Sequence, residues 1–222
     1  MQRLYDVVTF DCYGTLIDWE SGISSAFLEE ARRDGTTLDR AAVLGVYAKV
    51  EPVVESERYQ TYRDVLTETA VRVAQRFDWS IDRERAAFLA NSLPSWTPFA
   101  DTNPALRHLK AAGYRLGILS NTDDDLIAAT QHHFSVEFDF VITAQQVRAY
   151  KPAHAHFLAA RDRIGSARWL HAAESNFHDV VPTNALRIPN AWVNRGRRDA
   201  LPGGAPTHHV STLAELADLV VR

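Results

Sequence analysis

The sequence predicts an α/β protein in which a doubly wound parallel sheet carries an inserted bundle of helices. Residues 7–10, Val-Val-Thr-Phe, form a β-branched and aromatic run that is typical of a buried parallel strand. From residue 103 onward, short apolar runs alternate with helical patterns, as in right-handed βαβ units. Residues 18–94 contain helical patterns only. We therefore expect a core domain of residues 1–17 and 95–222 and a helical cap domain of residues 18–94.

The inserted region after the first strand is expected to form four helices. The predicted ranges are 21–33, 38–50, 58–77 and 82–93. The third has the clearest pattern, because its apolar and aromatic residues recur at helical spacing and share one face. These residues are Tyr59, Tyr62, Leu66, Val73 and Phe77. Pro52 is expected to end the second helix, whereas Asp82 is the predicted N-cap of the fourth and Pro94 follows its end.

The remainder of the chain is expected to alternate between helices and strands. The predicted strands cover residues 114–119, 138–142, 168–172, 190–193 and 208–210. The predicted helices cover residues 104–112, 123–133, 154–164, 178–186 and 213–221. Gly113 ends the first of these helices, and Lys151 and Pro152 precede the third. Such alternation predicts a parallel sheet with its helices packed on the faces.

The composition is that of an ordinary globular protein and excludes several classes. The 222 residues are 46% hydrophobic and carry a net charge of −4, which gives no footprint for nucleic-acid binding. No apolar run is long enough to span a bilayer, and the N-terminus is too short and polar for a signal peptide. The single cysteine, Cys12, excludes an internal disulfide and a cysteine-based metal cluster. We expect a cytoplasmic protein with neither nucleic-acid nor membrane partners.

Polar residues stand where four of the predicted strands or their connections end. The groups are Asp11 to Thr15, Ser120 with Asn121, Lys151, and Glu174-Ser175-Asn176 with Asp179. Each group alone has an ordinary explanation, since Asp and Asn cap helices and turns, and most lysines are solvated. In an open α/β sheet, however, the carboxyl ends of the strands meet at one crevice. We therefore expect these groups to form one site, with the helical insert covering it.

Other polar residues are interpreted without a central role. The basic cluster at positions 195, 197 and 198 is expected to be a solvated loop. The histidines lack a helical pair with a glutamate between them, so we assign them surface or capping roles rather than a zinc site. His178 is the exception, because its neighbour Asp179 brings it to the strand-end site.

Four ordered motifs resemble those of the haloacid dehalogenase superfamily. They are FDCYGTL at 10–16, LSNT at 119–122, YKP at 150–152 and SNFHD at 175–179. The resemblance spans nearly the whole chain, including the helical insert after the first motif. It implies a Rossmann-like core, a helical cap and a hydrolase that works through an aspartyl ester on Asp11.

The same resemblance implies a role for each motif residue. Thr15 donates its hydroxyl beside Asp11, and Ser120 and Asn121 hold the substrate anion. Lys151 stabilises the charge on Asp11, and its positive charge keeps that carboxylate ionised. Asn176 and Asp179 orient Lys151 and the hydrolytic water. The residues expected to bind the substrate are Cys12, Tyr13, Trp19, Ser120, Asn121 and Phe157.

Tyr13 indicates the branch of the superfamily. The phosphatases carry a second aspartate at this position, which protonates the leaving alkoxide and contributes about 10²–10⁴ in rate. A halide ion leaves without a proton, so an aromatic residue is tolerated there for carbon–halogen cleavage. The Asp-x-Tyr-Gly-Thr sequence is similar to the L-2-haloacid dehalogenases, which implies small 2-haloacids as substrates, 2-hydroxy acids as products and no cofactor. By analogy, a homodimer is expected.

Several positions depart from that branch. The arginine that helps bind the leaving halide is replaced by Ala48, with Lys49 beside it, and a tyrosine after the YKP motif is replaced by Phe157. Cys12 itself reads as a packing residue, because its neighbour Asp11 points to the opposite side. Trp19 lies at the predicted hinge, from where it is expected to line the crevice.

Two alternatives stay open. The first is a Mg²⁺-dependent phosphatase that manages without the usual acid. Its metal site would consist of Asp11, Glu174 and Asp179, whose oxygen atoms suit Mg²⁺. The second is a scaffold of the superfamily that has lost its substrate pocket, as the missing arginine suggests. The dehalogenase and the phosphatase hypotheses both imply a small anionic substrate.

Overall fold

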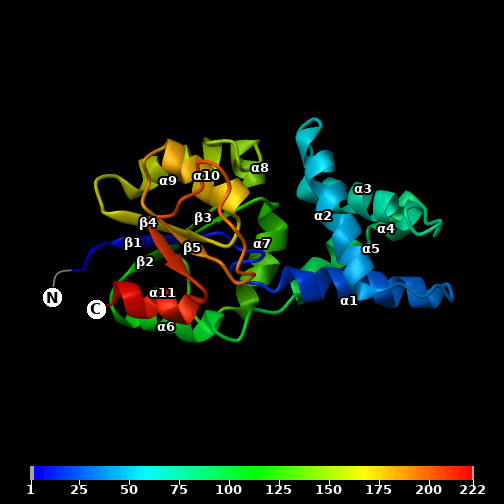
Figure 1. Cartoon of the computed structure of the whole chain (residues 1–222), viewed down its shortest axis with the longest axis horizontal. Helices are drawn as coiled ribbons and strands as arrows, with labels where there is room; N and C mark the ends of the chain where they lie inside the picture. Colours follow the sequence, from blue (N-terminus) through cyan, green and yellow to red (C-terminus); the bar gives the residue numbers. More distant parts are fainter. Residues whose placement is uncertain (1–2, 222) are drawn as a thin grey trace. The chain divides into compact units, whose positions relative to one another are not determined.

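A computed structural model describes residues 3–221 and shows a six-stranded sheet in which every pairing is parallel (Figure 1). The strand order is β3-β2-β1-β4-β5-β6. The strands are β1 (Val7–Phe10), β2 (Arg115–Ser120), β3 (Phe140–Thr143), β4 (Trp169–Ala173), β5 (Asn190–Val193) and β6 (His208–Val210). The predicted α/β class with a parallel sheet is confirmed, and each predicted strand is present with ends shifted by at most a few residues.

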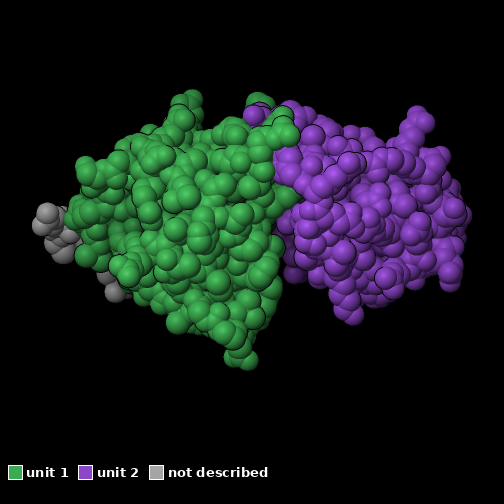
Figure 2. Space-filling view, turned by 90° about the horizontal axis from the view of Figure 1, so that it is seen from above, with its two compact units in different colours: residues 1–18, 98–121, 131–222 green, residues 19–97, 122–130 purple. Residues whose placement is uncertain are grey.

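The chain divides into two compact units (Figure 2). The sheet unit runs up to residue 18 and adds residues 98–121 and those from 131 onward, whereas the helical unit comprises residues 19–97 and 122–130. The helix α7 (Asp124–Thr130), which we expected in the sheet domain, clusters with the helical unit. The assignment of these units as catalytic core and cap stays a prediction.

Helices cover both faces of the sheet (Figure 1). On one face α6 (Thr102–Ala111) packs against α11 (Leu213–Val220). On the other lie α8 (Ala144–Val147), α9 (Ala155–Ile164) and α10 (Val181–Ala185). The central strands β1 and β4 are therefore buried on both sides, which explains why their residues are mostly apolar rather than alternating.

The register of the sheet aligns the ends of three strands. Phe10, the last residue of β1, lies opposite Ile118 of β2 and Ala172 of β4. Ser120 lies opposite Thr143 at the end of β3. Residues that follow these strands therefore emerge at the same edge of the sheet, as parallel connections require.

The helical unit begins with three helices, α1 (Trp19–Arg33), α2 (Arg40–Ser56) and α3 (Tyr62–Gln75). The prediction that Pro52 ends the second helix is wrong: α2 continues to Ser56, and the buried Val54 beyond the proline anchors its last turn. The third helix starts later than predicted, because the Thr61 side chain caps it by accepting from the Asp64 N–H. Tyr59 consequently lies outside the helical face assigned to it.

Three further predicted helices are interrupted. The predicted helix 82–93 consists of α4 (Arg83–Ala86), α5 (Phe88–Ser92) and the 3₁₀ turn η1 (Leu93–Ser95), although Asp82 is the N-cap as predicted. Helix α7 gives way to the 3₁₀ turn η2 (Gln131–His133). The predicted helix 178–186 is a π-helical turn, η3 (Asn176–Val180), followed by α10. None of the helices formed by residues 3–221 combines the length and hydrophobicity that a membrane span requires.

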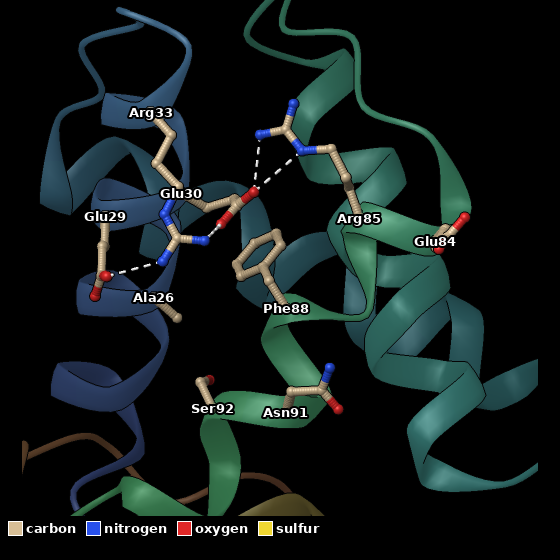
Figure 3. Close-up of a pocket in the computed structure, with 9 residues that line it drawn as sticks. All are labelled: Ala26, Glu29, Glu30, Arg33, Glu84, Arg85, Phe88, Asn91 and Ser92. Carbon is tan, nitrogen blue, oxygen red and sulfur yellow. Dashed lines mark hydrogen bonds and ion pairs between the residues drawn. The ribbon is translucent and has the colours of Figure 1, made fainter.

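A surface pocket in the helical unit is organised by the buried carboxylate of Glu30 (Figure 3). Arg33 donates to its Oε2 at 2.7 Å, and Arg85 donates to its Oε1 through Nη2 at 2.8 Å and through Nε at 3.1 Å. The pocket has a volume of about 450 Å³ and lies between α1 and the α4–α5 segment. Glu30 thus links α1 to α4, two elements far apart in sequence.

Replacing Glu30 with glutamine is expected to lower the free energy of unfolding by about 1–2 kcal/mol. The carboxylate is only 8% exposed, but its arginine partners are 59% and 38% exposed, so water screens part of the interaction. Urea denaturation measures the loss. Glu29→Gln is the matched control, since Glu29 is 63% exposed and bonded to Arg33 alone among the described side chains; it is expected to leave stability nearly unchanged. Equal losses in the two variants would contradict the role of Glu30.

Candidate active site

The loop that follows β1 holds the carboxylate of Asp11 at the edge of the sheet. Gly14 takes a positive φ of 99°, and the N–H groups of Leu16 and Ile17 both donate to the Cys12 carbonyl, which closes a tight turn. The Thr15 hydroxyl donates to Asp11 Oδ2 at 2.9 Å. The side chain of Asp11 is 12% exposed, so one carboxylate is presented from an otherwise buried loop.

Lys151 lies against this carboxylate with every proton of its ammonium group used. Its Nζ donates to Asp11 Oδ1 at 2.8 Å, to Asp179 Oδ1 at 2.7 Å and to the Leu119 carbonyl at 2.9 Å. The side chain is 1% exposed. Burial alone lowers the pKa of Lys151, but the charges of Asp11 and Asp179 outweigh it, and the pKa is raised above its ordinary value. The lysine is therefore a permanent cation at neutral pH.

Asn121 fixes the backbone of Lys151. The Asn121 Nδ2 group donates to the Lys151 carbonyl at 3.1 Å, and the Lys151 N–H donates to Asn121 Oδ1 at 2.7 Å. Both ends of the amide are thus engaged with the backbone of Lys151, and the role of Asn121 in holding the substrate anion stays a prediction. Ser120 keeps that role open, because its buried Oγ has no hydrogen-bond partner among the described residues.

Asp179 is the second carboxylate on Lys151, and it comes from the π-helical turn after β4. Its Oδ1 accepts from Lys151 and lies 3.0 Å from His171 Nε2, while Oδ2 is buried without a partner among residues 3–221. Burial raises the pKa of Asp179, but the charge of Lys151 and the hydrogen bond to His171 dominate, and the net shift is downward. The predicted pairing of Asp179 with Lys151 is present in the structure.

Glu174 contributes its backbone to this site. Its N–H donates to Thr15 Oγ1 at 2.9 Å, so the threonine hydroxyl accepts from Glu174 while it donates to Asp11. The Glu174 carboxylate pairs with Arg198 at 2.6 Å. Among residues 3–221, no three His, Cys, Asp or Glu side chains are arranged to hold a metal ion. The magnesium site considered from Asp11, Glu174 and Asp179 therefore does not fit this geometry.

Asn176 has a different partner from the predicted one. Its Nδ2 group donates to the Gly204 carbonyl at 2.8 Å, and its Oδ1 accepts from the Leu201 N–H at 3.1 Å. A side chain at Gly204 would overlap this amide, since a Cβ there would lie 1.9 Å from Oδ1. Asn176 thus anchors the loop before β6, and the predicted orientation of Lys151 by Asn176 is not supported by any contact described.

Two residues predicted to bind substrate are part of the packed interior. Cys12 is fully buried, which agrees with its interpretation as a packing residue, and its contact with substrate stays a prediction. Phe157 is also fully buried, in a core cluster with Leu119 and Phe140, and its ring meets that of His171 edge-on at 5.3 Å. Trp19 belongs to the helical unit, where its ring lies 5.7 Å from that of Tyr47, and its role stays a prediction. Tyr13 is half-buried beside the Asp11 turn.

Two residues at the site were not recognised in the sequence. Arg195 was interpreted as part of a solvated loop, but its side chain is only 18% exposed. It donates to the Thr15 carbonyl at 2.9 Å, pairs with Asp101 at 3.0 Å and lies over the Phe99 ring at 4.0 Å. His171, expected at the surface, is buried against Asp179. No pattern in the sequence distinguishes either residue from its neighbours.

The sequence is similar to those of known proteins. The family model of haloacid dehalogenase-like hydrolases matches residues 5–174. An (S)-2-haloacid dehalogenase of Pseudomonas putida is 30% identical over 231 residues, and the match covers 96% of each chain.

Solved structures share the fold. One is an L-2-haloacid dehalogenase of Xanthobacter autotrophicus with chloropropionic acid covalently bound. It superposes with a TM-score of 0.82 at 21% sequence identity, and the match covers 97% of this chain and 98% of the other. The HAD-hydrolase YfnB of Bacillus subtilis, solved with bound magnesium, gives a TM-score of 0.84 at 15% identity and 99% coverage of both chains. These two structures show that the fold is shared, whereas the family model and the Pseudomonas relative show to which family the chain belongs. The chain belongs to the haloacid dehalogenase-like hydrolases.

Proposed function

We propose that this hydrolase removes halide from small 2-haloacids and releases 2-hydroxy acids. The observation that carries the proposal is the carboxylate of Asp11, held by Lys151 and Thr15, with Tyr13 in the position where a phosphatase needs an acid. Cleavage of a carbon–halogen bond needs a nucleophile and no proton donor for the leaving group. The 30% identical relative from Pseudomonas putida, an (S)-2-haloacid dehalogenase, supports the same class of substrate.

The reaction consists of two displacements that share Asp11. A carboxylate oxygen of Asp11 attacks the α-carbon, the carbon–halogen bond breaks, and the halide leaves with the electron pair and with inversion at carbon. Water then adds to the carbonyl carbon of the new ester and loses a proton. The bond between this carbonyl carbon and the oxygen attached to the α-carbon then breaks, and that oxygen takes up one proton of the water and leaves as the hydroxyl group of the 2-hydroxy acid. The other proton of the water is released to solvent, which restores Asp11 as a carboxylate with one oxygen from water.

The surrounding residues prepare Asp11 for this reaction. The Lys151 ammonium and the Thr15 hydroxyl each bind one of its two oxygens, which orients the carboxylate for attack. During hydrolysis of the ester, the donor on the oxygen that did not attack stabilises the negative charge that develops on this carbonyl oxygen. The unpartnered Ser120 Oγ is the group we assign to the substrate carboxylate, and the unpartnered Asp179 Oδ2 is the acceptor we assign to the attacking water.

The reaction as proposed uses no metal ion, and no observation favours the magnesium-dependent phosphatase. Lys151 supplies the positive charge that a metal would supply between Asp11 and Asp179, while Glu174 is neutralised by Arg198. We also propose a cytoplasmic enzyme without cofactor or nucleic-acid partner, and a homodimer by analogy with the related dehalogenases. The helical unit is proposed as the cap that selects the substrate.

A substrate panel tests the proposal. Purified protein is incubated with (S)- and (R)-2-chloropropionate, 2-bromopropionate, chloroacetate and an aryl phosphate, with and without EDTA, and released halide and phosphate are measured. We expect halide release from the (S) acid that EDTA does not change, and (R)-lactate as the product because the displacement inverts the carbon. Phosphate release that EDTA abolishes would establish the phosphatase instead, and the absence of turnover across the panel would contradict the proposed function.

A further inference from the structure

We propose that His171 is a positioning residue: it holds Asp179, and through Asp179 it aims the ammonium group of Lys151 at Asp11. The geometric part of this inference concerns the resting protein and does not depend on the substrate. Its kinetic part rests on the proposed function. The inference goes beyond the motif residues, since His171 lies inside β4 and not in the loop that follows it.

The imidazole of His171 is held on three sides in the interior of the sheet unit. It lies opposite Thr9 in the β1–β4 register and is 1% exposed. Its Nδ1 is 2.8 Å from Thr9 Oγ1, and its Nε2 is 3.0 Å from Asp179 Oδ1. The Phe157 ring meets it edge-on at an interplanar angle of 81°. The ring therefore has a single orientation, with one nitrogen directed at the carboxylate that binds Lys151.

The partners of Thr9 assign the proton on the imidazole. The Trp169 indole, which can only donate, lies 2.7 Å from Thr9 Oγ1, so the threonine oxygen accepts from it. The hydroxyl proton of Thr9 is then directed to His171 Nδ1, the remaining neighbour described for this oxygen. Nδ1 consequently accepts, and the ring proton resides on Nε2, from where it is donated to Asp179 Oδ1. The chain of donors runs from Trp169 through Thr9 and His171 to Asp179.

The physical consequence is a carboxylate that cannot rotate. Asp179 Oδ1 receives hydrogen bonds from His171 and Lys151, whereas Oδ2 has no partner among residues 3–221. Without the His171 donor, the carboxylate would be free to turn part of the way about its Cβ–Cγ bond, and the oxygen that accepts from Lys151 would leave its position. The position of Lys151 Nζ relative to Asp11, and with it the rate of the chemical steps, would then vary. The binding of substrate, in contrast, would change little.

The proton assignment is tested first, on the resting protein. Long-range ¹⁵N–¹H spectra of protein labelled at histidine distinguish the two neutral tautomers and the doubly protonated ring. We expect the His171 signal to show a protonated Nε2 and an unprotonated Nδ1 at neutral pH, with the assignment made by its loss in His171→Gln. A proton on Nδ1 with none on Nε2 would overturn the inference whether or not the protein turns over any substrate, because Nε2 would then have nothing to donate to Asp179.

The kinetic part is tested with three variants. His171→Leu removes the donor, and we expect kcat to fall by about tenfold to hundredfold with KM nearly unchanged, as when an outer hydrogen-bond partner of a metal ligand is removed. His171→Gln retains an N–H that can reach Asp179, and it should recover much of the loss. Tyr114→Phe is the matched control, since it removes a buried hydrogen bond to the Val220 carbonyl without touching the site. Its kcat should equal that of the wild type.

The outcomes separate this inference from the proposed function. If His171→Leu and Tyr114→Phe lose equal amounts of activity and stability, or if the glutamine variant recovers nothing, His171 has only a structural role. If no substrate of the panel is turned over, the proposed function fails, and the tautomer alone decides whether His171 holds Asp179.

Discussion

Replacing Asp11 with asparagine is expected to lower kcat by about 10⁴-fold or more. The amide keeps the size of the side chain and an oxygen that can accept from Lys151, but it is a far weaker nucleophile than a carboxylate. Halide release from the best substrate of the panel measures the effect. Intact-mass analysis of the variant accompanies the assay, because deamidation of the asparagine would restore the wild-type residue.

A matched control exists at the opposite end of the same strand. Asp6 precedes β1 and pairs with Arg168 at 2.7 Å, and its side chain is 35% exposed. Asp6→Asn removes a carboxylate close in sequence to Asp11 and is expected to retain wild-type kcat.

A single-turnover reaction in ¹⁸O-water tests attack by Asp11 directly, since the water oxygen must first enter the peptide that contains Asp11. Label that appears only in the product would contradict attack by this carboxylate.

Replacing Lys151 with methionine is expected to have the second-largest effect, on activity and on stability together. The ammonium group is 1% exposed and neutralises two carboxylates, so its removal leaves buried charge uncompensated at a cost of about 3–5 kcal/mol. Activity should fall at least a hundredfold, because the donor on Asp11 Oδ1 is lost. Urea denaturation and halide release measure the two effects.

The contributions of Lys151 and Asp179 to stability depend on pH in opposite directions. The pKa of Lys151 is raised in the folded state, so its contribution is complete below about pH 10.4, the ordinary value for lysine, and is lost as the pH rises through the folded value. The pKa of Asp179 is lowered, so its contribution is complete above about pH 3.9 and is lost as the pH falls. Both contributions are therefore present at neutral pH.

The methionine variant should reverse part of this behaviour. Without the ammonium, burial favours the protonated form of Asp179, and the stability deficit relative to the wild type should shrink between pH 7 and pH 5. Lys110→Met is the matched control, because Lys110 pairs with Asp139 at 2.6 Å while remaining 29% exposed, and it should lose about 1 kcal/mol or less. Equal losses in the two lysine variants would show that Lys151 is not a buried cation.

Much of the fold and the central pair of the site followed from local patterns. The run of residues 7–10 predicted a buried strand, and the change from strand to helix periodicity predicted a parallel sheet, because both depend on near neighbours in the chain. Asp11, Thr15, Lys151 and Asp179 were predicted together because parallel strands deliver their carboxyl ends to one edge. Their contacts in the structure, 2.7–2.9 Å between donor and acceptor, follow from that topology.

Local patterns did not specify two features of the structure: where the second helix ends, and which partners two amide side chains take. Pro52 is an ordinary helix terminator, yet the buried Val54 beyond it anchors one more turn of α2. Asn121 and Asn176 were both predicted in the site, and the sequence did not indicate that Asn121 binds the backbone of Lys151 or that Asn176 binds the loop of residues 201–204. An amide has donors and acceptors that suit many partners, so its identity does not specify which one it takes.

The sequence by itself determined the class of fold, the edge of the sheet at which the polar groups meet and the proximity of Asp11 to Lys151. Only the tertiary structure decided the partners that orient them, above all His171 behind Asp179 and Arg195 behind Thr15. These partners come from strands and loops separated from β1 by more than a hundred residues. Which side chains meet across that distance depends on strand order, register and burial, and no local pattern of residues encodes them.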